Sequence, residues 1–247
     1  GGSESARRMA AASRGSLLFE LGRHREALAL ATGLAASSAA ASSTSEPGPA
    51  GEVPRDETQV RLDILASDVL ADVGRLESAL AFARRALTVA REPGVVRVAP
   101  LLYLEAELSL GLLLGDLGRT DEALTVLDEA FDAFERMGDA RGAAWAAKNR
   151  AFTLFAAGRQ AESLPHFEHA WRAGRELGVP FLEGIGALGV AEALVLGKPT
   201  PARDGRRTEE ALLAAERIAE ATHDRTLEWR CAALRGRILL EGGEYER

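Results

Sequence analysis

This sequence predicts an all-α fold built from repeated helical hairpins, and two observations support that prediction. The first is a short motif, Gly-Arg preceded by Leu, Val or Ala and followed within a few residues by Ala-Leu or Ser-Leu, that recurs along the chain. Its copies lie at residues 21–28, 73–80, 117–124 and 157–164, with a shorter version at 242–247. The second is that apolar residues recur at helical spacing before and after each copy. A motif repeated every few tens of residues is typical of a stacked-repeat architecture.

The copy around Gly118 shows why the motif indicates a turn between two helices. Leu108 and Leu112 precede the glycine, and Leu124 and Leu127 follow it, at spacings of three or four residues. Glycine reaches the left-handed conformation that ends a helix without a Cβ clash. The small alanine five residues later lets two helices approach closely. Each unit is therefore expected to be a helix, a short turn and a second helix.

These residues resemble the tetratricopeptide repeat, a family with characteristic small and glycine positions. The matching residues are Gly74, Ala79, Ala83 and Ala86 in the second unit, Gly111, Gly118, Ala123 and Ala130 in the third, Ala151, Gly158, Phe167 and Ala170 in the fourth, and Gly236, Gly243 and Tyr245 in the sixth. The anchor glycines Gly22, Gly74, Gly118 and Gly158 are 52, 44 and 40 residues apart. Those intervals exceed the usual repeat of about 34 residues. The chain is in this respect similar to the kinesin light chain subgroup and to sensor regions of bacterial transcription regulators.

The resemblance implies a right-handed superhelical solenoid of antiparallel helix pairs, with about 11 helices in one array. The expected units are residues 6–36, 56–91, 97–137, 140–177, 181–222 and a truncated 225–247. Residues 37–55 are predicted to be a flexible insertion, and residues 197–207 a loop insertion. Pro165 falls inside an expected helix, where it removes one backbone hydrogen bond. Because the sequence stops where a second helix is expected, we interpret it as a fragment of a longer protein.

The charge, the apolar runs and the cysteine content of the sequence bear on which partners and which compartment are expected. The net charge of −7 argues against direct nucleic-acid binding, and the arginine pairs are interleaved with acids. No uncharged apolar run reaches 18 residues, so no membrane span is expected. The single cysteine, Cys231, excludes an internal disulfide and fits a reducing, cytoplasmic compartment.

The sequence shows no catalytic motif, and we predict neither an enzyme nor a bound cofactor. His166 and His169 share a helix face with Glu162, which is the spacing of metal ligands. Such pairs are common by chance, so we interpret this face as polar helix surface and predict no metal.

The resemblance also implies a binding site, because the first helix of each repeat lines the concave groove. The groove residues that it indicates are Trp145, Lys148, Asn149, Phe152, Phe155, Glu105, Leu108, Leu112, Arg61, Asp68, Glu192, Arg230 and Arg237. Asn149 would clamp a peptide backbone and Lys148 would meet a carboxylate. The aromatic residues would act as apolar anchors, or alternatively belong to the core. Trp171 and Trp229 are expected to fill contacts between helices.

The function that follows is a non-catalytic scaffold that binds a protein or peptide in its concave groove. One alternative is a ligand-sensing or autoinhibitory array within a larger bacterial transcription regulator or signalling ATPase. Another is the repeat portion of a larger enzyme, such as a caspase-like protease. The expected partner is thus a protein, a peptide or another domain of the same parent chain, and neither nucleic acid nor a membrane.

Overall fold

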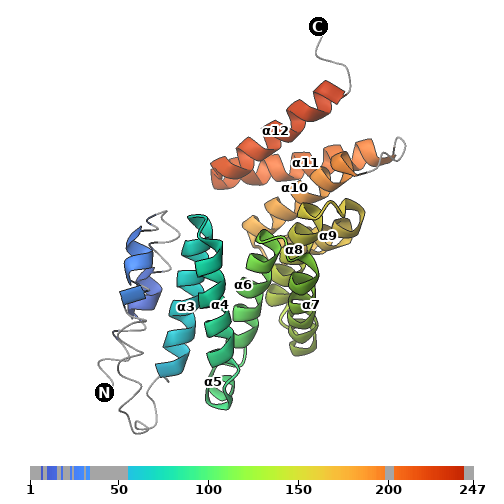
Figure 1. Ribbon diagram of the computed structural model, residues 1–247. Helices are drawn as coiled ribbons and strands as arrows, with labels where there is room; N and C mark the ends of the chain where they lie inside the picture. Colours follow the sequence, from blue (N-terminus) through green and yellow to red (C-terminus); the bar gives the residue numbers. More distant parts are fainter. Residues whose placement is uncertain are drawn as a thin grey trace. The chain divides into compact units, whose positions relative to one another are not determined.

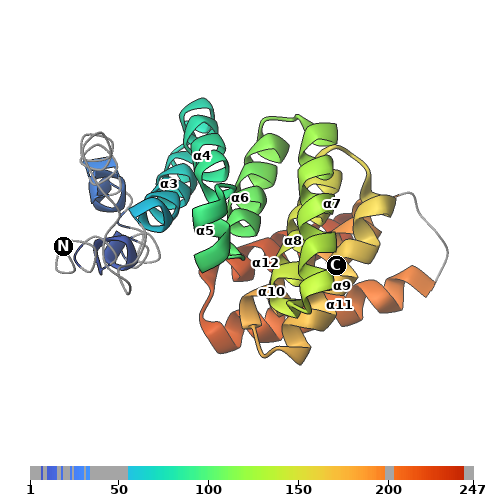
Figure 2. The ribbon, with the colours of Figure 1, turned by 90° about the horizontal axis from the view of Figure 1, so that it is seen from below.

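The computed structural model describes residues 55–197 and 203–241, together with shorter stretches between residues 7 and 33. This described part is helical and contains no strand (Figures 1 and 2). Its long helices and one short helix are α3 (Arg55–Asp72), α4 (Leu76–Ala90), α5 (Pro93–Val98), α6 (Leu102–Asp116), α7 (Thr120–Met137), α8 (Ala140–Ala156), α9 (Gln160–Glu176), α10 (Pro180–Leu196), α11 (Arg203–Thr222) and α12 (Arg225–Glu241). The predicted all-α class is confirmed.

The recurring glycines end helices in the way that the motif predicts. Gly74, Gly118 and Gly158 have φ values of 76°, 72° and 76°. In each case the following arginine donates its backbone N–H to a carbonyl five residues earlier. The three bonds, Arg75 to Leu70, Arg119 to Leu114 and Arg159 to Leu154, measure 2.8, 2.8 and 2.9 Å. This is the glycine-dependent helix ending in which the left-handed residue turns the chain back on itself.

The chain divides into two compact units, residues 1–119 and residues 120–247. In the first unit α4 contacts both α3 and α6, and α3 also contacts α6. The short helix α5 joins α4 to α6. The side chains of Leu62, Leu102 and Leu104 are almost completely buried between these helices.

In the second unit each helix from α7 to α12 contacts the next one along the chain. In addition, α10 contacts α8 and α12, so the first helices of successive hairpins form a row of their own. The core between the helices contains Phe167 of α9, Leu188 of α10 and Leu212 of α11. Gly186 of α10 lies so close to α9 that an added Cβ would be 2.5 Å from the backbone nitrogen of Trp171.

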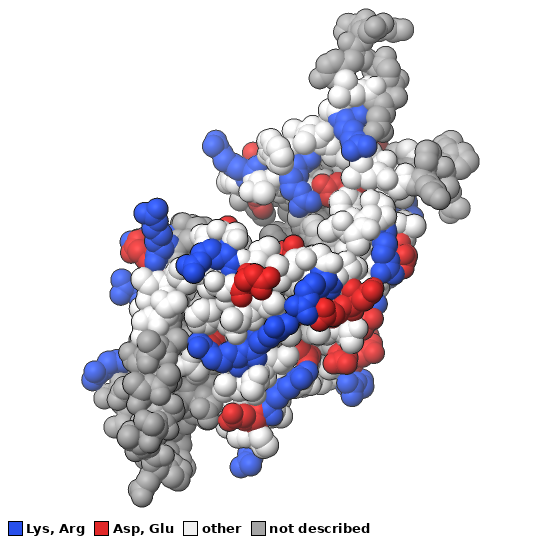
Figure 3. Space-filling view, viewed as in Figure 1, with Lys and Arg blue, Asp and Glu red and all other residues white. Residues whose placement is uncertain are grey.

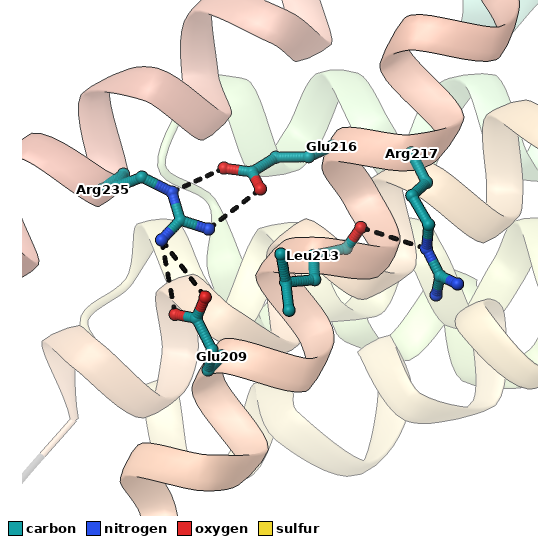
Figure 4. A network of polar contacts seen from close by, with 5 residues as sticks. All are labelled: Glu209, Leu213, Glu216, Arg217 and Arg235. Atoms are coloured by element: carbon teal, nitrogen blue, oxygen red, sulfur yellow. Dashed lines mark hydrogen bonds and ion pairs between the residues drawn. The ribbon is translucent and has the colours of Figure 1, made fainter.

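An ion-pair network joins α11 to α12 (Figure 4). Arg235 of α12 donates to Glu216 at 2.7 and 2.9 Å and to Glu209 at 3.2 Å. Both carboxylates raise the pKa of the Arg235 guanidinium further above its ordinary value. One arginine therefore binds two side chains that lie two turns apart on α11.

Three details differ from the sequence-based expectations. The loop insertion expected at 197–207 does not include residues 203–207, because α11 begins at Arg203; Gly205 disfavours a helix in this stretch but does not prevent it. Helix α5 was not expected, although Pro93 at its first turn is a common helix start. Trp229 does not fill a contact between helices, since its side chain is 71% exposed.

Two further expectations concern residues of α9. α9 continues through Pro165, and Trp171 packs against the core as expected. The insertion expected at 37–55 lies outside the described residues except for Arg55, which is the first residue of α3. None of the described helices is long and apolar enough to cross a membrane. Acidic and basic side chains are interspersed over the face seen in Figure 3.

Candidate binding site

The residues predicted for the groove on α8 lie on one stripe of that helix. Trp145, Lys148, Phe152 and Phe155 follow one another at intervals of three or four residues, which places them on one helix face. The three aromatic side chains are partly buried. Lys148 is 9% exposed and Asn149 4% exposed, so both polar groups lie beneath the surface of this face.

The Trp145 ring is stacked on Phe181, the second residue of α10. The ring centroids are 5.5 Å apart and the planes differ by 18°. The Nζ of Lys148 lies 4.8 Å from the centroid of the Trp145 ring and 5.9 Å from that of Phe181. Such distances give a favourable cation–π interaction. Phe181 remains 49% exposed, so the stack presents an aromatic surface to solvent.

A second cation lies at the other end of the same stripe. Arg230 of α12 binds Glu192 of α10 with a distance of 2.8 Å between Nη2 and Oε2. Its guanidinium carbon is 5.7 Å from the centroid of Phe152. Burial raises the pKa of the Glu192 carboxyl, and Arg230 opposes that shift. We call Trp145, Lys148, Phe152, Phe181, Glu192 and Arg230 the α8–α10–α12 cluster.

Two aromatic residues of the stripe, Phe152 and Phe155, also pack against the hydrophobic core. The rings of Phe152 and Phe155 meet the fully buried ring of Phe167 edge-on, with centroids 5.2 and 6.1 Å apart. The two interpretations of these aromatic residues are therefore compatible, because one edge of each ring packs inward. Arg237, also expected in the site, is an exposed residue of α12.

The remaining predicted site residues belong to the first unit, on α3 and α6. Arg61 lies 3.1 Å from Glu57 and 3.7 Å from Glu105. Asp68 accepts a hydrogen bond of 3.0 Å from the hydroxyl of Ser109. Leu108 and Leu112 of α6 are partly buried. The predicted residues thus form a mixed polar and apolar set on α3 and α6 and a separate set, with the aromatic side chains, in the second unit.

Sequence reasoning missed Phe181. The residue lies before the first position that the repeat pattern assigns to that helix. Pro180, which occupies the first turn of α10, was the signal that could have placed Phe181 on the helix.

The sequence also did not indicate two buried carboxylates of the first unit, Asp63 and Glu107. Arg85 donates to Asp63 at 2.6 Å through Nε, and Arg91 donates to Glu107 at 2.6 Å. These pairs fasten α4 to α3 and to α6. They are structural contacts rather than candidates for ligand binding.

One histidine of the pair on α9, His169, lies against α7. His169 meets the Phe131 ring edge-on at 5.4 Å between centroids, and Glu162 pairs with Arg159. Burial lowers the pKa of His166 to about 4 and also lowers that of His169. Among the described residues, no group of three or more acidic, histidine or cysteine side chains is placed to hold a metal ion.

A protein of stacked helical repeats is the class that these hairpins define. Residues 102–176, which span α6 to α9, match the family model described as tetratricopeptide repeat. The match covers 75 of the 247 residues, so the likeness to that family concerns this part of the chain. No curated protein sequence matches the chain.

Three solved structures share the fold. PlcR from Bacillus thuringiensis in its apo form has 14% identity and a TM-score of 0.69, covering 94% of this chain and 79% of that chain. The Rap protein in complex with Competence and Sporulation Factor has 15% identity and a TM-score of 0.66, and this chain covers 64% of its length. The TPR-like repeats of a kinesin light chain from Podosopora anserina have 13% identity and a TM-score of 0.58, covering 90% of this chain and 98% of that chain. At these identities the likeness concerns the fold.

Proposed function

We propose that this chain is a scaffold that binds a peptide or protein segment through the first helices of its repeats. In the second unit the α8–α10–α12 cluster would form the contact surface. The observation that carries the proposal is the half-exposed Phe181 ring stacked on Trp145. Aromatic side chains and arginine are the residues that most often dominate the energy of protein interfaces.

The polar members of the site would orient the bound segment. The Asn149 amide offers both a donor and an acceptor, which matches one peptide unit of an extended chain. Lys148 would favour a carboxylate near the Trp145 ring. The first unit would offer a contact surface of its own, made of Arg61, Asp68 and Glu105 with the partly buried Leu108 and Leu112.

The test is a selection of random linear peptides against the chain, followed by calorimetric titration of the strongest binder. We expect Phe181→Ala to weaken that binder by about 1–3 kcal/mol, as for an interface anchor. Leu177→Ala is the matched control, since Leu177 is 42% exposed on the turn just before α10. Equal affinity of the wild type and the Phe181→Ala variant would show that the stack is not the binding surface.

The polar part of the site has its own test. The double variant Lys148→Ala, Asn149→Ala should lose about 1–3 kcal/mol of binding if both groups contact the ligand. Circular dichroism must first show an unchanged fold, because both side chains are buried. The same variant serves as the control when the chain is used to capture partners from the lysate of its native cells.

A second candidate function is a ligand-sensing array that controls another domain of a larger regulator. It is favoured by the likeness to PlcR, whose structure was solved with the peptide PapR7 and DNA, and to Rap with Competence and Sporulation Factor. In that case the same cluster would bind a small peptide, and the response would appear elsewhere in the parent protein. A DNA-binding or nucleotide-binding domain encoded beside this segment would favour this candidate over a stand-alone scaffold.

A further inference from the structure

The first turn of helix α4 differs from the other copies of the repeat motif at a position where they carry a glutamate. The motif arginine is followed three residues later by Glu26, Glu122 and Glu162 in the first, third and fourth copies. In the second copy, Arg75 is followed at the same distance by Ser78. A hydroxyl thus replaces, in one copy, the carboxylate that the other three copies share.

The carboxylate at this position binds the motif arginine in two of those copies. Arg23 donates to the two carboxylate oxygens of Glu26 at 2.7 Å each. Arg159 donates to those of Glu162 at 2.8 and 2.5 Å. The hydrogen bonds from Arg159 lower the pKa of the Glu162 carboxyl, because they favour its charged form. The motif arginine is therefore placed to bind an anionic group three residues further on.

The corresponding contact in the second copy is longer and involves a neutral group. Nη2 of Arg75 lies 3.4 Å from Oγ of Ser78. Arg75 is also the residue that precedes α4, and its side chain does not cap the helix. The partial positive charge of a helix N-terminus adds to that of the guanidinium. Glu77 is the acidic residue of this turn, but it points about 100° around the helix from Ser78.

We propose that Ser78 is a phosphorylation site whose phosphate is bound by Arg75. Oγ of Ser78 forms a bond to the γ-phosphorus of a nucleoside triphosphate, and the bond from that phosphorus to the nucleoside diphosphate breaks. The hydroxyl proton passes to a base of the serine kinase that catalyses the transfer. A phosphoserine carries nearly two negative charges and three acceptor oxygens. It supplies the anion that the other copies carry as glutamate.

The position of Ser78 suits a reversible modification. The turn that precedes it is exposed from Asp72 to Arg75, and Ser78 itself is half-buried in the first turn of α4. Helix ends open more readily than helix interiors, which gives a kinase access to the hydroxyl. Once added, the phosphate binds the closed turn through Arg75. Modification therefore stabilises the hairpin of α3 and α4.

The first test detects the modification itself. The full chain is incubated with ATP, phosphatase inhibitors and a lysate of its native cells, and the phosphorylated residues are mapped by mass spectrometry. We expect phosphate on Ser78, and the Ser78→Ala variant should lack that phosphopeptide. The proposal is overturned if Ser78 carries no phosphate.

Thr88 is the matched control position on the same helix. It is exposed and also follows an arginine, Arg85, by three residues. Thr88 lies in the last turn of α4, however, and Arg85 already binds Asp63. A negative charge is disfavoured at that end of a helix. Phosphate found on Thr88 and not on Ser78 would contradict the role of the repeat position.

The second test concerns the role of Arg75. Ser78→Glu copies the other turns and should raise the midpoint of thermal unfolding by about 1–2 °C, whereas Thr88→Glu should not raise it. The chain prepared with phosphoserine at position 78 should show a larger rise. Both rises should be smaller in the Arg75→Ala background, because the pair is then lost. Equal rises with and without Arg75 would overturn the assignment of Arg75 as the phosphate-binding residue.

Discussion

At the scale of single residues, the buried carboxylate of Asp63 makes the stability of the fold depend on its hydrogen-bond and ion-pair partners. The carboxylate of Asp63 is completely buried, whereas its partner Arg85 keeps about half of its side chain exposed. Gln59 donates a further hydrogen bond of 2.7 Å to the carboxylate. A buried carboxylate has lost its hydrating water, so only its ion-pair and hydrogen-bond partners stabilise its charge.

Removing the Arg85 side chain should therefore destabilise the folded state. We expect Arg85→Ala to lower the free energy of unfolding by about 3 kcal/mol, since an uncompensated carboxylate remains inside. Adding Asp63→Asn to that variant should restore part of the loss. Urea unfolding measures both effects. Arg84→Ala is the control because Arg84 is an exposed neighbour on the same helix, and a similar loss there would contradict the assignment.

His166 makes stability depend on pH. Its pKa falls from an ordinary value of 6.5 to about 4, mainly because burial disfavours the charged form. Between these values the unfolded chain binds a proton that the folded chain does not. The stabilising contribution is thus fully present above pH 6.5 and is lost as the pH falls toward 4.

The measurement is urea unfolding at pH 7 and pH 5. We expect His166→Gln to reduce the loss of stability between the two, whereas His223→Asn should not change it. His223 is an exposed turn residue with a φ of 54°, a conformation that asparagine tolerates. An unchanged pH dependence in the His166→Gln variant would contradict this account.

At the scale of helices, the spacing between α9 and α10 depends on glycine. A Cβ at Gly186 would meet backbone atoms of Trp171, and backbone cannot move aside as a flexible side chain can. We expect Gly186→Ala to lower the free energy of unfolding by about 1–3 kcal/mol through overpacking. Gly205→Ala, in an open helical position, should instead raise stability by about 0.5–1 kcal/mol. Thermal unfolding of both variants checks the two signs, and a stabilising Gly186→Ala would refute the close approach.

At the scale of the whole molecule, each helix mainly contacts helices close to it in sequence. In such a solenoid, stability is approximately a sum of local terms and contacts between neighbours. Hydrogen exchange should therefore report local effects. We expect Arg85→Ala to speed amide exchange in α3 and α4 and to leave exchange in α9 to α12 unchanged. Gly186→Ala should instead speed amide exchange in α9 and α10 and leave α3 and α4 unchanged. Uniform acceleration along the chain would indicate one cooperative unit instead.

Much of the fold could be predicted from the sequence because its signals are local. The positive φ of Gly118 and the helical spacing of Leu124 and Leu127 follow from backbone sterics and helix geometry within about ten residues. The all-α class and the helical hairpins depend on such signals alone. The α8 stripe from Trp145 to Phe155 is local in the same sense, so the sequence could place those side chains on one face.

Contacts between helices could not be predicted in this way. The stacking of Phe181 on Trp145, the pairing of Arg230 with Glu192, and the exposure of Trp229 depend on which helices pack together. The sequence pattern cannot distinguish a tryptophan that is covered by a neighbour from one that is not, since both occupy the same helical position. The sequence by itself therefore determined the helical hairpins and the turns within them. Only the tertiary structure decided which faces are buried, because burial is a property of neighbours that lie far apart along the chain.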